Sequence, residues 1–108
     1  MEIISLIYTN KINPRLIGNF LENNCGFCHY KRSRGRDILE NSMEGISIII
    51  SKFKIEIMYK NDKRNKIACL VEKLSIFNNK HKVSLKIYKV EEKDNIKHSL
   101  KMQDYYLI

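Results

Sequence analysis

Hydrophobic and polar positions change their period several times along the chain, and each change predicts an element. Residues 2–8 form a short apolar run of β-rich composition that predicts a buried strand. The stretch from residue 27 to about residue 32 predicts a second strand. The isoleucines at 46–50 again predict β structure. In 53–60, apolar residues alternate with mostly charged ones, which is typical of a half-buried strand. Residues 83–88 alternate in the same way and predict the last main strand.

Two other segments carry helical spacing. Asn13 is an N-cap and Pro14 a first helical residue, so a helix is predicted from there to about Asn24. The second helix should begin at Asp62 as its cap and carries apolar residues at i, i+3, i+4 and i+7. We expect Asn78–Asn79 to break it. The order strand, helix, strand therefore occurs twice along the chain.

This order predicts an α+β chain with a ferredoxin-like βαββαβ arrangement, a four-stranded antiparallel sheet carrying two helices on one face. We expect one domain spanning residues 1–108. The polar and poorly periodic stretch from about Ser33 to Gly45 predicts a long loop. One face of such a sheet stays uncovered, and apolar residues on both sides of the strands predict that another subunit covers it.

Composition narrows the class of protein. With 44% hydrophobic residues and no apolar run near the ~20 residues that span a bilayer, we expect a globular cytoplasmic protein without an export signal. The net charge of +8, from 20 basic against 12 acidic residues, favours acidic partners such as nucleotides, nucleic acid or anionic lipid surfaces. Many lysines are scattered and are expected to be ordinary solubilising residues: Lys52, Lys54, Lys60, Lys63, Lys66 and Lys73.

The densest charge lies in residues 31–36, which read Lys-Arg-Ser-Arg-Gly-Arg. Arginine presents a fork of donors that matches phosphate oxygens, and glycine lets backbone N–H groups approach the same anion. The run therefore predicts an anion site. A solvated basic turn is the alternative, and these six residues alone do not separate the two.

A Cys-Gly-Phe-Cys-His run at 25–29 has the spacing by which c-type haem is attached. Haem attachment requires export, and a zinc site would need a second ligand pair that the remaining cysteine and histidines do not supply. A thioredoxin-like motif would open a helix, whereas this run follows one. We expect Cys25 and Cys28 to be small half-buried residues without a metal, and Cys69 to be a core residue of the second helix. A metal or redox protein using Cys25, Cys28 and His29 is kept as the third hypothesis.

Signatures of catalysis are missing from the sequence. The histidines are not joined to a Ser, Cys or carboxylate by any hydrolase pattern, and neither a Walker A sequence nor a G-x-G-x-x-G sequence is present. We therefore expect a protein that is not an enzyme, with no catalytic residues and no cofactor.

Six pieces of the chain match, in their order and spacing, the segments of a known protein family. They are residues 1–8, Asn13 to Asn24, Arg34-Gly35-Arg36-Asp37, Lys54-Ile55-Glu56-Ile57, Asp62 to Ile76, and Val90-Glu91-Glu92. In this order, over about residues 1–98, the chain resembles the nitrogen-regulatory PII signalling family. The resemblance implies a homotrimer that binds an adenine nucleotide or another anion between its subunits. It further implies a mobile loop, about 37–51, that engages an unknown target protein such as a membrane transporter or an enzyme. The residues expected at the ligand are Arg34, Gly35, Arg36, Asp37, Lys80, Lys82 and Lys97.

The chain also departs from the family pattern. Asp37 stands where the family has a Gln that helps to bind magnesium and 2-oxoglutarate. Residues 77–82 keep cations but lack the glycines with which the family's phosphate loop cradles its ligand. The first hypothesis is thus a divergent PII-like regulator for a different nucleotide or anion. The second is a small basic ferredoxin-like protein that binds nucleic acid, for which four aromatic residues would have to form an exposed stacking surface: Tyr8, Phe27, Tyr30 and Tyr59.

Overall fold

The computed structural model describes residues 1–33, 35–81 and 85–92. Within this part of the chain, strands and helices follow in this order: β1 (Glu2–Tyr8), α1 (Pro14–Asn24), β2 (Cys28–Ser33), β3 (Arg36–Asn41), β4 (Ile46–Ile50), β5 (Lys54–Tyr59), a 3-10 turn (Asn61–Lys63), α2 (Arg64–Lys80) and β6 (Leu85–Glu92). None of the described helices is long and apolar enough to cross a membrane.

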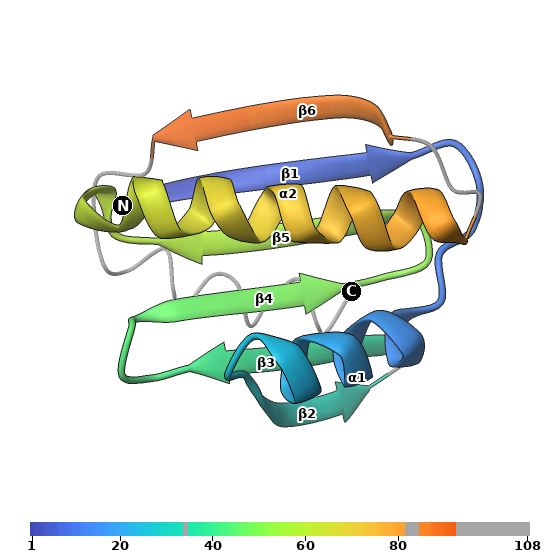
Figure 1. Cartoon of the computed structure of the whole chain (residues 1–108), viewed down its shortest axis with the longest axis horizontal. Helices are drawn as coiled ribbons and strands as arrows, with labels where there is room; N and C mark the ends of the chain where they lie inside the picture. Colours follow the sequence, from blue (N-terminus) through green and yellow to red (C-terminus); the bar gives the residue numbers. More distant parts are fainter. Residues whose placement is uncertain (34, 82–84, 93–108) are drawn as a thin grey trace.

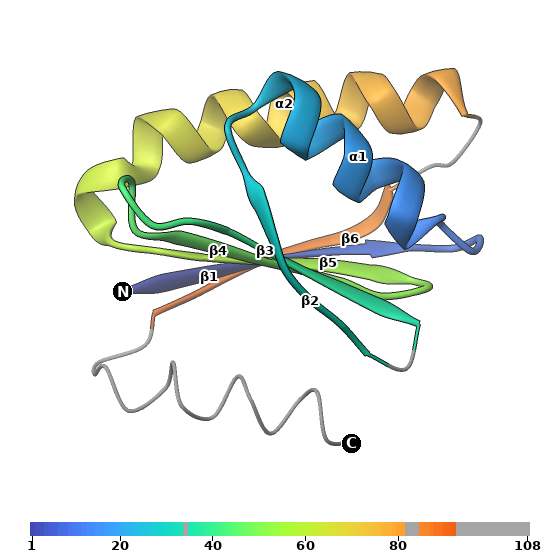
Figure 2. The same ribbon diagram turned by 90° about the horizontal axis from the view of Figure 1, so that it is seen from below.

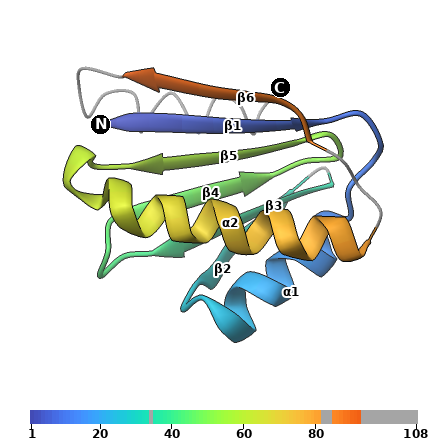
Figure 3. The same ribbon diagram turned by 45° about the horizontal axis from the view of Figure 1, so that its top comes forward.

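All described strands belong to one antiparallel sheet in the order β2-β3-β4-β5-β1-β6. Both helices lie on the same face of this sheet (Figures 1 and 2). Figure 3 shows α1 on the β2–β3 side, beside α2. The α+β class with two helices on one face is therefore confirmed, but the predicted count of four strands was wrong because the sheet has six.

Of the two additional strands, β3 comes from the segment predicted to be a loop, whereas β2 matches the strand predicted from residue 27 to about residue 32. The strands β4, β5, β1 and β6 keep the expected order around the two helices, and the hairpin β2–β3 extends the sheet beyond β4. β3 pairs with β4 from Asp37↔Ile50 to Asn41↔Ile46. The predicted loop from Ser33 to Gly45 and the predicted mobile loop at 37–51 were therefore wrong. This region consists of two paired strands joined by a short turn.

The main core fills the space between the sheet and the helices. β1, β4 and β5 each place alternate side chains there, and α1 and α2 add one apolar stripe each. The opposite face of the sheet carries a second small cluster of Ile3, Ile49 and Met58. Burial on both faces corrects the expectation that β5 is half-buried: Glu56 and Met58 are buried along with their core-facing neighbours.

α2 ends at Lys80, one residue beyond the predicted break at Asn78–Asn79. α2 continues to Lys80 because Asn78 does not face solvent: it is buried, and its Nδ2 donates a hydrogen bond to Tyr8 Oη over 2.8 Å. Burial raises the pKa of Tyr8 above its ordinary value, and the hydrogen bond from Asn78 offsets part of this rise. The contact joins the last turns of α2 to the end of β1.

Replacing Asn78 by Ala should lower the free energy of unfolding by about 1–3 kcal/mol, because the buried Tyr8 hydroxyl then loses its partner. Urea unfolding measures this directly. The neighbouring Asn79→Ala, at an exposed position, should change stability by less than about 0.5 kcal/mol. Equal effects of the two substitutions would contradict the role given to Asn78.

The start of α2 is joined to the rest of the fold by ion pairs. Arg64 donates through two nitrogens to both carboxylate oxygens of the buried Glu2. Glu44, in the β3–β4 turn, accepts from Lys66 at 2.6 Å and from Lys63 at 3.0 Å. These contacts connect α2 to β1 and to the β3–β4 turn.

The Glu44 contacts predict a pH dependence. Hydrogen bonds from Lys66 and Lys63 hold the pKa of Glu44 below its ordinary value of 4.5. A lowered folded-state pKa gives stability that is present above the unfolded-state pKa and is lost as the pH falls through the folded-state pKa. Glu44→Gln should therefore have a lower urea midpoint than the parent at about pH 7, and the two midpoints should converge as the pH falls from there through the folded-state pKa of Glu44. A gap that stays constant over this range would contradict the assignment.

Candidate anion-binding site

Two turns meet at one end of the sheet and enclose a basic hollow. Gly35 lies in the β2–β3 turn, and Ser51–Phe53 connect β4 to β5. Because β3 pairs with β4, these turns fall side by side, and a Cβ on Gly35 would lie 3.9 Å from Lys52 Cε. The basic hollow has a volume of about 540 Å³ and is lined by Ile7, Gly35, Arg36, Ser51, Lys52, Phe53 and Lys54.

The backbone of the β4–β5 turn is held by hydrogen bonds from Tyr8, from Ile12 and between Ser51 and Lys54. The Phe53 carbonyl accepts from the Tyr8 N–H over 2.8 Å, and the Lys52 carbonyl accepts from the Ile12 N–H over 2.7 Å. The Ser51 N–H and Oγ both donate to the Lys54 carbonyl, at 2.9 and 3.2 Å. The side chains of Lys52 and Phe53 thus project from a fixed backbone.

Gly35 has a conformational reason to be glycine. Its φ is +73°, in the left-handed region that side chains rarely adopt, and this geometry closes the β2–β3 turn. Arg36 follows at once as the first residue of β3. The turn at Gly35 therefore sets the position from which the Arg36 side chain extends from the sheet.

The charges around the basic hollow are largely uncompensated. Lys54 Nζ lies 3.4 Å from Glu56 Oε1, which offsets part of its charge. Within the described part of the chain, no carboxylate forms an ion pair with Arg36 or Lys52. Beside them, Phe53 is 45% exposed, so its side chain can be reached from solvent. The site offers two free cations next to an accessible aromatic ring.

Asp37 does not take part in this hollow. Its side chain is 0% exposed, and its Oδ1 lies 3.3 Å from Arg32 Nε. Its partner in the register is Ile50, a residue of the main core, so Asp37 lies on the helix side of β3. Asp37, which was predicted at the ligand, therefore does not line the basic hollow, and the hollow lacks a carboxylate that would repel an anion.

Apart from Asp37, the sequence-predicted ligand residues divide into three groups. Gly35 and Arg36 line the basic hollow. Lys80 is exposed at the last position of α2 and does not line it. The remaining three lie outside the described residues: Arg34, Lys82 and Lys97.

Sequence reasoning missed Lys52, Phe53 and Lys54 as site residues. Lys52 and Lys54 were expected to be ordinary solubilising positions, and Phe53 was assigned to the strand. The predicted strands 46–50 and 53–60 left a turn at residues 51–52. Its proximity to Gly35 could not be recognised without β3, because only the pairing of β3 with β4 brings the two turns to one edge.

The Cys-x-x-Cys-His run is divided between two places. Cys25 is the half-buried C-cap residue of α1, whereas Cys28 is exposed on β2. Cys69 is exposed, which corrects its assignment to the core. In the described ranges, no three His, Cys, Asp or Glu side chains are grouped so that they could hold a metal ion.

The aromatic surface required by the second hypothesis does not form as expected. Tyr8, Phe27 and Tyr59 are buried in the main core. The side chain of Tyr30 lies outside what the structure describes. Among the aromatic side chains that the structure describes, Phe53 is exposed and lies next to cations.

Comparison of the chain with protein-family models, with curated proteins and with solved structures found no match. The resemblance to the PII family therefore remains a prediction from the sequence. The functional conclusion has to come from the chemistry of the basic hollow.

Proposed function

We propose that this protein is a non-enzymatic binding protein that takes a phosphate-bearing ligand in the basic hollow, with a nucleotide as the ligand class. One observation carries the proposal: Arg36, at the start of β3, and Lys52, in the β4–β5 turn, flank the same hollow, and neither forms an ion pair with a carboxylate of the described chain. Two cations converging on one space cost free energy through repulsion unless an anion joins them.

The chemistry of the hollow favours a nucleotide over inorganic phosphate. Arg36 can donate two parallel hydrogen bonds to phosphate oxygens, and Lys52 adds a point charge. The exposed ring of Phe53 supplies a surface on which a base can stack, a contact typically worth about 1–3 kcal/mol. Inorganic phosphate would use the cations and leave the ring unused.

The PII-like part of the proposal is a regulatory role, without the loop mechanism. Four strands in the order β4-β5-β1-β6 with two helices support a ferredoxin-like core, which the hairpin β2–β3 extends. Since 37–51 forms paired strands, switching through that segment is not proposed. We keep the homotrimer as part of the proposal, and light scattering that gives a stable monomer at micromolar concentration would remove it.

Single-stranded nucleic acid is the second candidate, and the exposed Phe53 beside Lys52 is the observation that favours it. The two candidates differ in how binding depends on ligand length and salt. An oligonucleotide that contacts several phosphates should bind with a steep salt dependence, whereas a mononucleotide at one hollow should show a shallow one.

Isothermal titration with ATP, AMP, adenosine and a short single-stranded RNA tests the proposal. We expect affinity to fall from ATP to AMP to adenosine, because phosphate charge supplies most of the contact. RNA binding that is much tighter than ATP binding and steeply salt-dependent would replace the first candidate by the second. Failure of all four ligands to bind would contradict both.

A further inference from the structure

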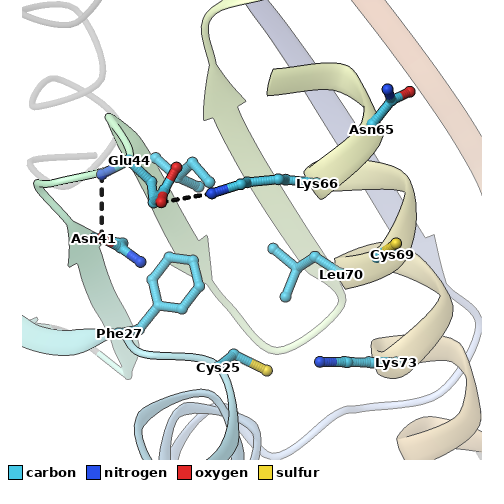
Figure 4. Close-up of a pocket in the computed structure, with 10 residues that line it drawn as sticks. Cys25, Phe27, Asn41, Glu44, Asn65, Lys66, Cys69, Leu70 and Lys73 are labelled. Atoms are coloured by element: carbon cyan, nitrogen blue, oxygen red, sulfur yellow. Dashed lines mark hydrogen bonds and ion pairs between the residues drawn. The ribbon is translucent and has the colours of Figure 1, made fainter. Parts of the chain in front are cut away.

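A second hollow lies at the opposite end of β3 from the basic hollow. It opens between α2, the end of α1 and the β3–β4 turn, and has a volume of about 450 Å³ (Figure 4). We call it the thiol hollow because two cysteines line it. Its lining residues are Cys25, Phe27, Asn41, Glu44, Ile46, Asn65, Lys66, Cys69, Leu70 and Lys73.

The inner wall of the thiol hollow is apolar. Phe27, Ile46 and Leu70 are buried residues of the main core that also border the hollow. Figure 4 shows the Phe27 ring facing Leu70 across it. An apolar group of ligand size placed here would remove apolar surface from water on both sides, which favours binding.

The outer wall of the thiol hollow is positively charged. Its one carboxylate, Glu44, already accepts hydrogen bonds from Lys66 and Lys63. Lys73 points toward the hollow beside Cys25 (Figure 4), and among the described residues it forms no ion pair. The ammonium group of Lys73 therefore gives the thiol hollow a positive charge.

The Cys25 thiol does not cancel that charge. Burial raises its pKa above the ordinary value of 9.0, and the nearby charge of Lys73 lowers it by a smaller amount. The thiol is therefore neutral at physiological pH and behaves as a small apolar group. It adds apolar surface close to the ammonium group.

Asn41 adds a neutral donor. Its Oδ1 accepts a hydrogen bond from the Glu44 N–H over 3.2 Å, so the other side-chain atom, Nδ2, is the donor that remains. Figure 4 shows this nitrogen near Phe27. The hollow thus presents donors around an apolar wall, the usual composition of a small-molecule site.

We propose that the thiol hollow binds a small carboxylate whose apolar body packs between Phe27 and Leu70 and whose charge faces Lys73. A cationic ligand would meet the ammonium groups of Lys66 and Lys73 and is disfavoured. A neutral apolar ligand would fill the inner wall and leave the donors unused. This site is separate from the nucleotide proposal, so either can hold without the other.

The probe for this site is 3-phenylpropionate, and its matched control is 3-phenylpropanamide, which has nearly the same shape without the charge. In a ¹H–¹⁵N NMR titration of the full chain, we expect the carboxylate to shift the backbone amides of Phe27, Cys69, Leu70 and Lys73 and to bind at least about fivefold more tightly than the amide. Equal affinities, or shifts located elsewhere, would overturn the proposal.

Lys73→Gln keeps most of the side-chain length and removes the charge. It should weaken 3-phenylpropionate about threefold to tenfold and leave the amide unchanged. Lys80→Gln, an exposed lysine of the same helix outside the hollow, should have no effect on either ligand. Equal losses in the two variants would overturn the proposal. ATP titrated against Lys73→Gln should bind as it does to the parent, which distinguishes failure of this site from failure of the basic hollow.

Discussion

Reversing both free charges of the basic hollow, in an Arg36→Glu, Lys52→Glu double variant, should weaken ATP binding at least about a hundredfold. A hydrogen bond to a charged group is worth about 1.5–3 kcal/mol, so losing two such donors exceeds the 2.7 kcal/mol or so of a hundredfold change. Repulsion between the new carboxylates and the phosphates adds to this loss. Isothermal titration of ATP at fixed ionic strength measures the effect.

The control for this double variant has the same net charge. Lys60→Glu with Lys80→Glu changes two exposed lysines that do not line the basic hollow. We expect the control to bind ATP within about threefold of the parent, because its charges are distant and screened by salt. If both double variants lost binding equally, the interaction would depend on total charge, and the site at Arg36 and Lys52 would be refuted.

Leu39→Ala should lower the free energy of unfolding by about 2–5 kcal/mol, the range measured for large-to-small substitutions in protein cores. Leu39 is 0% exposed in the middle of β3, paired with Ile48 of β4. In a mobile loop the same substitution would change stability very little. Urea unfolding therefore separates a sheet that includes β3 from the loop expected from the sequence.

Met43 provides the matched control for Leu39. It lies four positions further on, in the β3–β4 turn, and is 95% exposed. Met43→Ala should alter stability by no more than about 0.5 kcal/mol. If Leu39→Ala prevents folding, the milder Ile48→Val should still cost about 0.5–1.5 kcal/mol. Effects near zero at both core positions would contradict the six-stranded sheet.

Elements with a strong local signal were predicted correctly. The strand at residues 2–8 has the observed bounds of β1. Asn13 caps α1 through its Oδ1, which accepts from the N–H groups of Arg15 and Leu16 at 3.1 and 3.2 Å. These features depend on neighbours within three residues, so the sequence alone carries them.

Elements that depend on distant contacts were not predictable in the same way. β3 reads Arg-Asp-Ile-Leu-Glu-Asn, and its charged residues conceal a strand that is recognisable only when it pairs with β4. The last turn of α2 depends on Asn78 reaching Tyr8, a partner 70 positions away. The second helix also begins two residues after the predicted cap at Asp62, following a 3-10 turn.

For the same reason, only part of the candidate site could be predicted from the sequence. Gly35 and Arg36 are adjacent, and their chemistry is readable from the basic run alone. Lys52 and Phe53 join them only through the pairing of β3 with β4, which no local pattern indicated.

The most direct test of the proposed function is a ¹H–¹⁵N NMR titration of the full chain with ATP. We expect saturable shifts concentrated at the amides of Gly35, Arg36, Lys52 and Phe53. A Phe53→Ala variant should bind ATP more weakly and pyrophosphate with unchanged affinity. Absence of saturable shifts at millimolar ATP, or saturable shifts confined to other parts of the sheet, would contradict the proposed function.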